Sequence, residues 1–275
     1  MRGSTRWLAV VACGLGLVAR ADPAAEPALD QQKAVEFTSL SDSARRALVK
    51  ATPRDELARI MNETPQARLL SMGQRIVVGI NTYSYRMLKQ ERVKGELLPE
   101  QTIDVFIREV PFAVRLHYVN GPGAGRKVAY APSVRASEFR VREAGLLSIA
   151  GAIWLNVDSS FAKSDSNHTV REAGIGTLLA RLMRDTERAK PLGGFPLAPE
   201  GWNDKGEYCG SYLSPPANPP FDYARTRICT DLLTGVPMKV EGYGLKGELL
   251  EKWHFSNFKP DTYPSEFFDP EKARF

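Results

Sequence analysis

The chain has 275 residues, of which 43% are hydrophobic and 25% charged, and its formal net charge is +5. This composition is typical of a soluble globular protein and excludes an intrinsically disordered chain, a collagen and a coiled coil. Three cysteines are too few for a disulfide-dense small protein, and a chain of this length can bury a core without such bonds.

Residues 1–21 have the pattern of a cleavable export signal. Two arginines precede an apolar stretch at residues 7–18, and Ala19 and Ala21 are the small residues that predict cleavage before Asp22. The apolar stretch is shorter than the roughly 20 residues that cross a bilayer. We therefore expect a mature chain that is exported to the periplasm.

A lipoprotein signal is the alternative, in which residues 10–13 act as a lipobox and Cys13 becomes the acylated first residue. Conventional cleavage explains the segment better, because apolar residues that follow Cys13 would otherwise remain on the mature chain. Conventional cleavage also removes three arginines and no acidic residue, so that +5 becomes +2. We therefore expect no nucleic-acid partner.

Two cysteines remain after cleavage, Cys209 and Cys229. In an oxidising compartment they are expected to pair rather than to stay free. The bond would close a loop of 20 residues and stabilise the fold by on the order of 3 kcal/mol. The loop contains residues 214–220, Ser-Pro-Pro-Ala-Asn-Pro-Pro, which cannot form a regular strand ladder.

The first elements predicted after the signal are a tether and a series of helices. Residues 22–38 are rich in Ala, Pro, Glu and Gln without an apolar period, which predicts a flexible tether to a single domain at 39–275. A short helix is predicted at 41–50, and start signals with a proline follow at 52–55 and 64–65.

From about Tyr83 the apolar period changes to two, which predicts an antiparallel sheet with one dry and one wet face. The clearest strands are predicted at 102–110, 113–119, 138–142, 238–243 and 249–258, with a hairpin turn at 120–125. Residues 146–158 predict one or two deeply buried strands. A single amphipathic helix is predicted at 169–190, where apolar residues recur at helical spacing from Ile175 to Met183. The fold class is therefore α+β.

The sequence has no motif of a known hydrolase or metal site, so we predict no catalytic residue, no metal and no cofactor. The chain has three histidines, each alone in its segment: His117, His168 and His254. The acidic residues Glu91, Asp104 and Glu109 are assigned to the wet face of the sheet.

One polar loop is a candidate for catalysis or cation binding. Asp158, Asp165, Asn167 and His168 could seat a hard cation or orient a general base. The favoured interpretation is a polar loop in which Asn167 or Thr169 caps the next helix.

Aromatic residues recur on the predicted strands, and two interpretations of them remain open. They either fill an ordinary core or line the concave face of an incompletely closed barrel with room for an apolar guest. As candidate ligand-binding residues we take Tyr83, Tyr85, Phe106, Tyr118, Trp253 and Phe255.

Several ordered blocks give the chain a resemblance to a known family. They include residues 89–97 (Lys-Gln-Glu-Arg-Val-Lys-Gly-Glu-Leu), 107–112 (Ile-Arg-Glu-Val-Pro-Phe) and 125–130 (Gly-Arg-Lys-Val-Ala-Tyr). Further blocks lie at Asn167-His168, at 172–176, at 234–237 (Thr-Gly-Val-Pro), at 241–243 (Glu-Gly-Tyr), at Leu250-Glu251 and at 267–270 (Phe-Phe-Asp-Pro). Over most of residues 65–275 the chain resembles a bacterial family of domains of unknown function, DUF1571.

That family is similar to the periplasmic lipoprotein carriers LolA and LolB. The similarity implies a curved antiparallel sheet, a half-barrel, wrapped around a few helices, with an apolar cavity for acyl chains. The implied function is a carrier or binding protein whose partner is a lipid or a lipidated protein. Transient contact with a membrane surface and a monomeric state are also expected. The alternatives are a hydrolase or metal-dependent enzyme that uses Asp158, Asp165 and His168, or a non-catalytic envelope scaffold.

Overall fold

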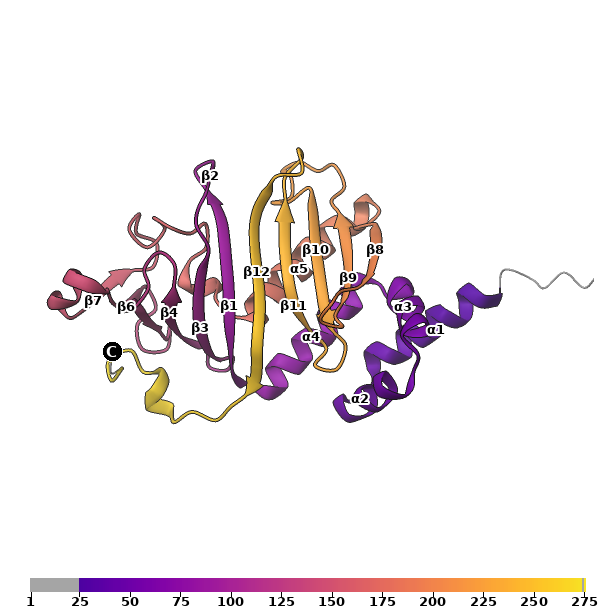
Figure 1. The fold of residues 1–275 in the computed structure, drawn as a ribbon, viewed down its shortest axis with the longest axis horizontal. Helices are drawn as coiled ribbons and strands as arrows, with labels where there is room; N and C mark the ends of the chain where they lie inside the picture. Colours follow the sequence, from indigo (N-terminus) through magenta and orange to yellow (C-terminus); the bar gives the residue numbers. More distant parts are fainter. Residues whose placement is uncertain (1–24, 274) are drawn as a thin grey trace, which may run out of the picture.

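The structure is a computed structural model that describes residues 25–273 and 275. The export signal predicted at 1–21, and Cys13 with it, lie outside the described residues. Within the described residues, twelve strands form one antiparallel sheet in the order β7-β6-β5-β4-β3-β1-β12-β11-β10-β9-β8, and β2 pairs with β1 (Figure 1). Because β7 and β8 form the two edges and do not pair, the sheet is curved but not closed.

The strands predicted at 102–110, 113–119, 138–142, 238–243 and 249–258 are all present, whereas the strands at 96–97, 127–130, 197–202, 208–213 and 225–231 were not predicted individually. The strands of the sheet are β1 (Thr82–Val93), β2 (Glu96–Leu97), β3 (Gln101–Arg108), β4 (Ala113–Asn120), β5 (Lys127–Tyr130), β6 (Glu138–Arg142), β7 (Ala152–Asn156), β8 (Leu197–Trp202), β9 (Tyr208–Leu213), β10 (Arg225–Asp231), β11 (Val236–Tyr243) and β12 (Leu249–Pro260). The Gly-rich residues 121–126 connect β4 to β5, as the predicted hairpin requires.

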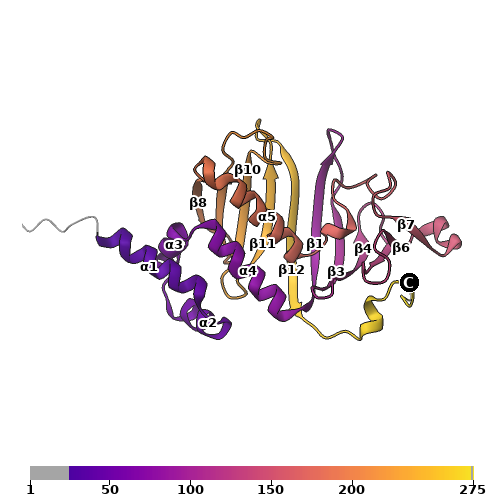
Figure 2. The same ribbon diagram turned by 180° about the vertical axis from the view of Figure 1, so that it is seen from behind.

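Two long helices cover the concave face of the sheet, α4 (Gln66–Ile80) and α5 (Ile175–Ala189). They pack against each other across the face, as the view from behind shows (Figure 2). Leu178, Leu179 and Leu182 of α5 are buried against the sheet, which follows from their helical spacing. The predicted α+β fold with a curved antiparallel sheet around helices is confirmed.

The other helices lie beyond the β8 edge: α1 (Ala25–Ser39), α2 (Asp42–Ala51) and α3 (Arg54–Glu63) (Figure 1). Ser41 caps α2, as predicted, because its hydroxyl accepts a hydrogen bond from the Ala44 amide. Arg45 attaches α2 to the β10–β11 turn, since its guanidinium donates to the carbonyls of Leu232 and Leu233.

The tether predicted at 22–38 is corrected by the structure, because the chain is helical from Ala25 onward. Ala34 and Phe37 of α1 are fully buried in a second core with α3, α4 and Tyr208. The composition of the segment lacks an apolar period, so α1 is stabilised by these few tertiary contacts rather than by a regular apolar stripe.

The prediction of one or two deeply buried strands at 146–158 is corrected in part, because one strand is present but it is not deeply buried. The chain forms a short 3-10 helix, η1 (Gly145–Ala150), and then the edge strand β7. Leu146 and Ile149 are 87% and 85% exposed, so the apolar run does not enter the core. An edge strand has only one neighbour to cover it, and apolar composition alone does not distinguish it from a central strand.

The predicted disulfide between Cys209 and Cys229 is present and joins the adjacent strands β9 and β10. It closes a loop with a sequence separation of 20. Replacing both cysteines with serine is expected to lower the free energy of unfolding by about 3 kcal/mol, because the unfolded chain regains the entropy of the open loop. Urea unfolding of the wild type and of the variant measures the difference. A difference below about 0.5 kcal/mol would contradict the prediction, since the loop-entropy estimate is several times larger.

Candidate functional site

A cavity of about 330 Å³ lies on the concave face of the sheet. Its walls are β1, the strands from β3 to β7, β12, one side of α5, and the connection between β7 and α5, residues 157–174, which we call the strap. The volume is within the range of about 300–1,000 Å³ that is usual for small-molecule sites.

Alternation along the strands explains the apolar wall of the cavity. On β1 and β3, Tyr85, Met87, Ile103 and Val105 share one face, because the register pairs Tyr85 with Val105 and Met87 with Ile103. Leu116 of β4 continues this face opposite Val105. The wall is therefore continuous across neighbouring strands.

The strap is attached across the cavity by polar contacts to the sheet. The Asp165 carboxylate pairs with Arg126 of the β4–β5 turn at 2.8 Å. The backbone amide of Asn167 and the hydroxyl of Ser166 both donate to the Glu91 carboxylate of β1, at 2.7 and 3.2 Å. These contacts hold the strap over the end of the cavity where β1 approaches β2.

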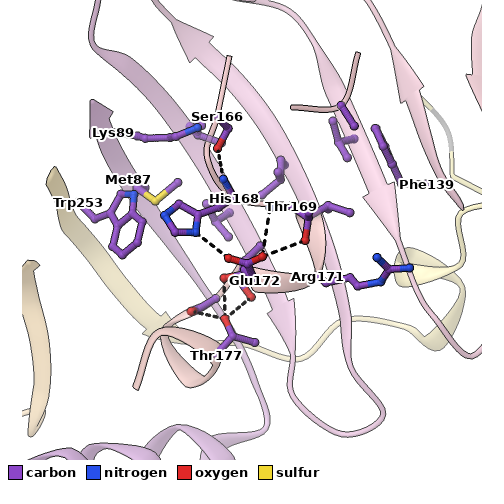
Figure 3. A pocket seen from close by; sticks show the side chains of 18 of the residues that line it. Met87, Lys89, Phe139, Ser166, His168, Thr169, Arg171, Glu172, Thr177 and Trp253 are labelled. Carbon is purple, nitrogen blue, oxygen red and sulfur yellow. Dashed lines mark hydrogen bonds and ion pairs between the residues drawn. The ribbon is translucent and has the colours of Figure 1, made fainter. Parts of the chain in front are cut away.

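His168 lies at the centre of this polar end. Its Nδ1 is 2.6 Å from Glu172 and its Nε2 is 2.7 Å from Glu251 of β12. Figure 3 shows the imidazole between Trp253 and Glu172, with Phe139 across the cavity. Arg181 of α5 pairs with the other oxygen of Glu251 at 3.0 Å and lies over the Trp253 ring.

The protonation state of His168 follows from these contacts. Burial by itself lowers the pKa of His168, but the carboxylates of Glu172 and Glu251 outweigh burial and the nearby Arg181, and they raise the pKa to about 9. The hydrogen bond with His168 also lowers the pKa of Glu172. At neutral pH the ring is therefore an imidazolium that donates from both nitrogens.

Glu91, His168 and Glu251 offer oxygen and nitrogen atoms that all lie within 4.8 Å of one another, a spacing that could hold a metal ion. The donor set does not fit a cation as it stands. An imidazolium has no free lone pair to ligate a metal, and Lys89 and Arg181 already place positive charge beside the two carboxylates. The chemistry of this end is that of a buried ion-pair network.

Four of the predicted ligand-binding residues line the cavity: Tyr85, Tyr118, Trp253 and Phe255. Tyr83 is fully buried on the same face of β1 but is not part of the lining; its hydroxyl donates to Glu109. Burial raises the pKa of Glu109, and the hydrogen bonds from Tyr83 and the backbone of Gly176 oppose that effect.

Phe106 is the exception and is corrected by the structure. It lies on the other face of β3, where it contacts Tyr263 and Phe267 of the C-terminal segment. The register of β3 with β4 pairs it with Arg115, whereas its neighbours Val105 and Ile107 face the cavity side. Side chains alternate along a strand, so Phe106 cannot share a face with Val105.

The proposed enzymatic cluster is not assembled. Asp165 and His168 both line the cavity, but Asp158 does not, and it pairs with Arg171 at 2.9 Å. Asp165 pairs with Arg126, and His168 pairs with two glutamates. Thr169 forms a capping box with Glu172 on the short 3-10 helix η2 (Val170–Glu172), whereas Gly174 precedes α5. The interpretation of a capped polar loop is therefore the better one.

Sequence reasoning missed Lys89 and Glu251 and placed Glu91 on the wet face. All three are buried; Lys89 is 8% exposed, Glu251 4% and Glu91 2%. The spacing in the sequence already indicated this burial. Lys89 and Glu91 lie two and four residues after Met87 and so share its face of β1, and Glu251 shares a face of β12 with Trp253 and Phe255. They were not assigned to the cavity face because charged side chains on a strand are usually exposed to solvent.

Among the described helices, none combines the length and the hydropathy that a membrane crossing requires. The family model described as "Protein of unknown function (DUF1571)" matches residues 80–274, a range that contains all the strands and the whole cavity. No curated protein matches the chain.

Solved structures with a similar arrangement are distant in sequence. An uncharacterized conserved protein from Thermus thermophilus has 9% identity and a TM-score of 0.42, covering 73% of this chain and 90% of that one. A LolA superfamily protein from Nitrosomonas europaea has 10% identity and a TM-score of 0.31, covering 73% and 95%. A putative outer membrane lipoprotein-sorting protein domain from Vibrio parahaemolyticus has 12% identity and a TM-score of 0.35, covering 74% and 98%.

Proposed function

We propose that this chain, which belongs to the DUF1571 family, is a periplasmic binding or carrier protein for a hydrophobic ligand. The ligand would be a lipid, or the acyl chains of a lipidated protein, held in the cavity under the strap. The observation that carries the proposal is the apolar wall of that cavity, which leaves about 330 Å³ that the protein's own side chains do not fill. Each methylene group transferred from water to such a wall contributes about 0.8 kcal/mol.

The proposed compartment is supported by the disulfide. Cys209 and Cys229 are bonded, and structural disulfides persist in oxidising compartments such as the periplasm. An export signal at residues 1–21 agrees with this placement as an expectation from the sequence.

A binding role also agrees better with the site than hydrolysis does. The carboxylates that line the cavity are each paired with a cation of the same lining, and Asp158, Asp165 and His168 do not converge on a common point. A scaffold role on the convex face is less favoured, because part of that face is covered by Tyr263, Phe267 and Phe268.

The test is ligand content and uptake of the natively purified mature protein. Native mass spectrometry is expected to show a retained lipid, and after delipidation the protein should take up one fluorescent fatty acid per chain with saturation. A protein that carries no lipid and takes up the fatty acid without saturation would exclude the proposal.

A further inference from the structure

The polar end of the cavity contains one buried cation whose donors are not all used. Lys89 lies on β1 directly between the apolar wall and the strap, and its side chain is 10% exposed. Its ammonium is 3.3 Å from Glu91, longer than the roughly 2.7–2.9 Å of a strong charge-assisted hydrogen bond. Figure 3 shows the side chain extending toward Ser166 of the strap.

The Glu91 carboxylate is already engaged by other donors. It accepts from the Asn167 amide at 2.7 Å and from the Ser166 hydroxyl at 3.2 Å. Within the part of the chain that the structure describes, Glu91 is the one ion-pair partner of Lys89. An ammonium has three donors, so Lys89 retains hydrogen-bonding capacity at the cavity wall.

Three other cations of the cavity lining each contact two acceptor groups: Arg126, His168 and Arg181. Arg126 contacts both Glu143 and Asp165 at 2.9 and 2.8 Å. His168 donates to two glutamates, and Arg181 pairs with Glu251 and donates to the Tyr223 hydroxyl. Lys89 differs from them because, among the described residues, it pairs with one carboxylate, that of Glu91.

We propose that the ligand is an amphiphile with an anionic oxygen head group, a carboxylate or a phosphate, and that Lys89 binds this head group while the chain occupies the apolar wall. This inference rests on the proposed function and specifies its ligand class. Met87 precedes Lys89 on the same face of β1, so a chain that lies along Tyr85 and Met87 ends at the ammonium. Burial lowers the pKa of Lys89, but Glu91 and other nearby groups raise it above its ordinary value, so the charge is kept.

The experiment compares ligands that share one chain and differ in the head group. Dodecanoic acid, monododecyl phosphate and dodecanol are titrated at neutral pH into the delipidated mature protein and into its Lys89→Met variant. The wild type is expected to bind one of the two anionic ligands about tenfold to a hundredfold more tightly than dodecanol, the range expected for a hydrogen bond to a charged group. The anion that binds more tightly identifies the head group. Lys89→Met is expected to lose this preference and to keep its affinity for dodecanol.

Two further variants serve as controls. Lys163→Met removes an exposed lysine of the strap and should leave the preference unchanged. If Lys89→Met fails to fold because Glu91 loses its partner, Lys89→Met combined with Glu91→Gln removes both charges together and keeps an amide oxygen that can accept from Asn167. The double variant is expected to show the same loss of preference.

The outcomes separate the two proposals. If the wild type binds neither the acids nor the alcohol, the proposed function fails. If it binds all three ligands equally, the inference of an anionic head group fails while the proposed function stands. If Lys89→Met retains the preference, the assignment of Lys89 fails. Acetate and monododecyl phosphate are also compared as competitors of bound dodecanoic acid. If acetate, which has no long chain, displaces it as effectively as monododecyl phosphate does, the site recognises free anions and the inference is overturned.

Discussion

Replacing Ala180 with tryptophan is expected to abolish most of the fatty-acid uptake while leaving the protein folded. Ala180 lies on the side of α5 that lines the cavity, next to Thr177 and Arg181. Leu179 and Leu182 of α5 belong to the packed core, do not line the cavity and lie on a neighbouring side of the helix. An indole at position 180 would therefore enter the empty space rather than the packed core.

The expected size of the effect follows from the volume of the cavity. A tryptophan side chain would occupy a large part of about 330 Å³ and compete directly with an acyl chain. If it excludes even two methylene groups, the loss of about 0.8 kcal/mol for each reduces the affinity more than tenfold. Stability should stay the same or rise, because filling a void commonly adds about 0.5–2 kcal/mol.

Fluorescent fatty-acid titration and thermal unfolding measure the two parts of this prediction. The matched control is Ala47→Trp, which adds the same side chain at an exposed position of α2 and should alter neither uptake nor stability. An unchanged affinity in a folded Ala180→Trp protein would show that the fatty acid binds elsewhere.

The stability of the protein is expected to fall as the pH rises from about 6.5 toward 9 and above. The folded protein holds a proton on His168 with a pKa of about 9, against an ordinary value of 6.5. A group whose pKa is raised by folding contributes its stability fully below the unfolded pKa and loses it as the pH passes through the folded pKa. The shift corresponds to on the order of 3 kcal/mol.

Replacing His168 with glutamine should remove this alkaline decline. The measurement is urea unfolding across the pH range from 6 to 10, with the wild type and the variant compared at each pH. The two curves of unfolding free energy should differ most below pH 6.5 and converge above pH 9. Parallel curves would mean that the Glu172 and Glu251 contacts do not hold the proton.

His117→Gln is the matched control, because this histidine has the opposite shift. Burial and the nearby Arg115 lower the pKa of His117 to about 4. His117 therefore lowers the free energy of unfolding only below pH 6.5, where the histidine of the unfolded chain is protonated and that of the folded chain is not. The His117→Gln variant should differ from the wild type on the acid side and keep the alkaline decline.

Local chemistry was sufficient for several elements of this protein. The hydroxyl of Ser41 can cap only the helix that follows it, so α2 begins where its sequence predicts. Likewise, the glycines between β4 and β5 permit the turn that joins two alternating strands. The pairing of Cys209 with Cys229 required only the expectation of an oxidising compartment and the count of cysteines that remain.

The face of β3 on which Phe106 lies could have been predicted from the sequence, but its aromatic side chain led to its assignment to the cavity. Its alternation with Val105 and Ile107 already placed it on the opposite face of β3, where its aromatic ring needed another cover. That cover is provided by Tyr263 and Phe267, which are distant in the sequence. The identity of the covering segment could not be read from the strand itself.

The buried ion-pair network depended on the tertiary structure. A lysine or glutamate on a strand is ordinarily solvated, and burying its charge is unfavourable unless partners are supplied. For Glu91 those partners come from the strap, through Ser166 and Asn167, and for Glu251 they come from His168 and from Arg181 of α5. The amino-acid pattern specified α2, α5 and the clearest strands through local periodicity and capping, and it specified the disulfide through the number of cysteines. The cavity, its strap and its charged end arose only when segments far apart in the chain met, because the free energy of a buried charge depends on groups that its own segment does not contain.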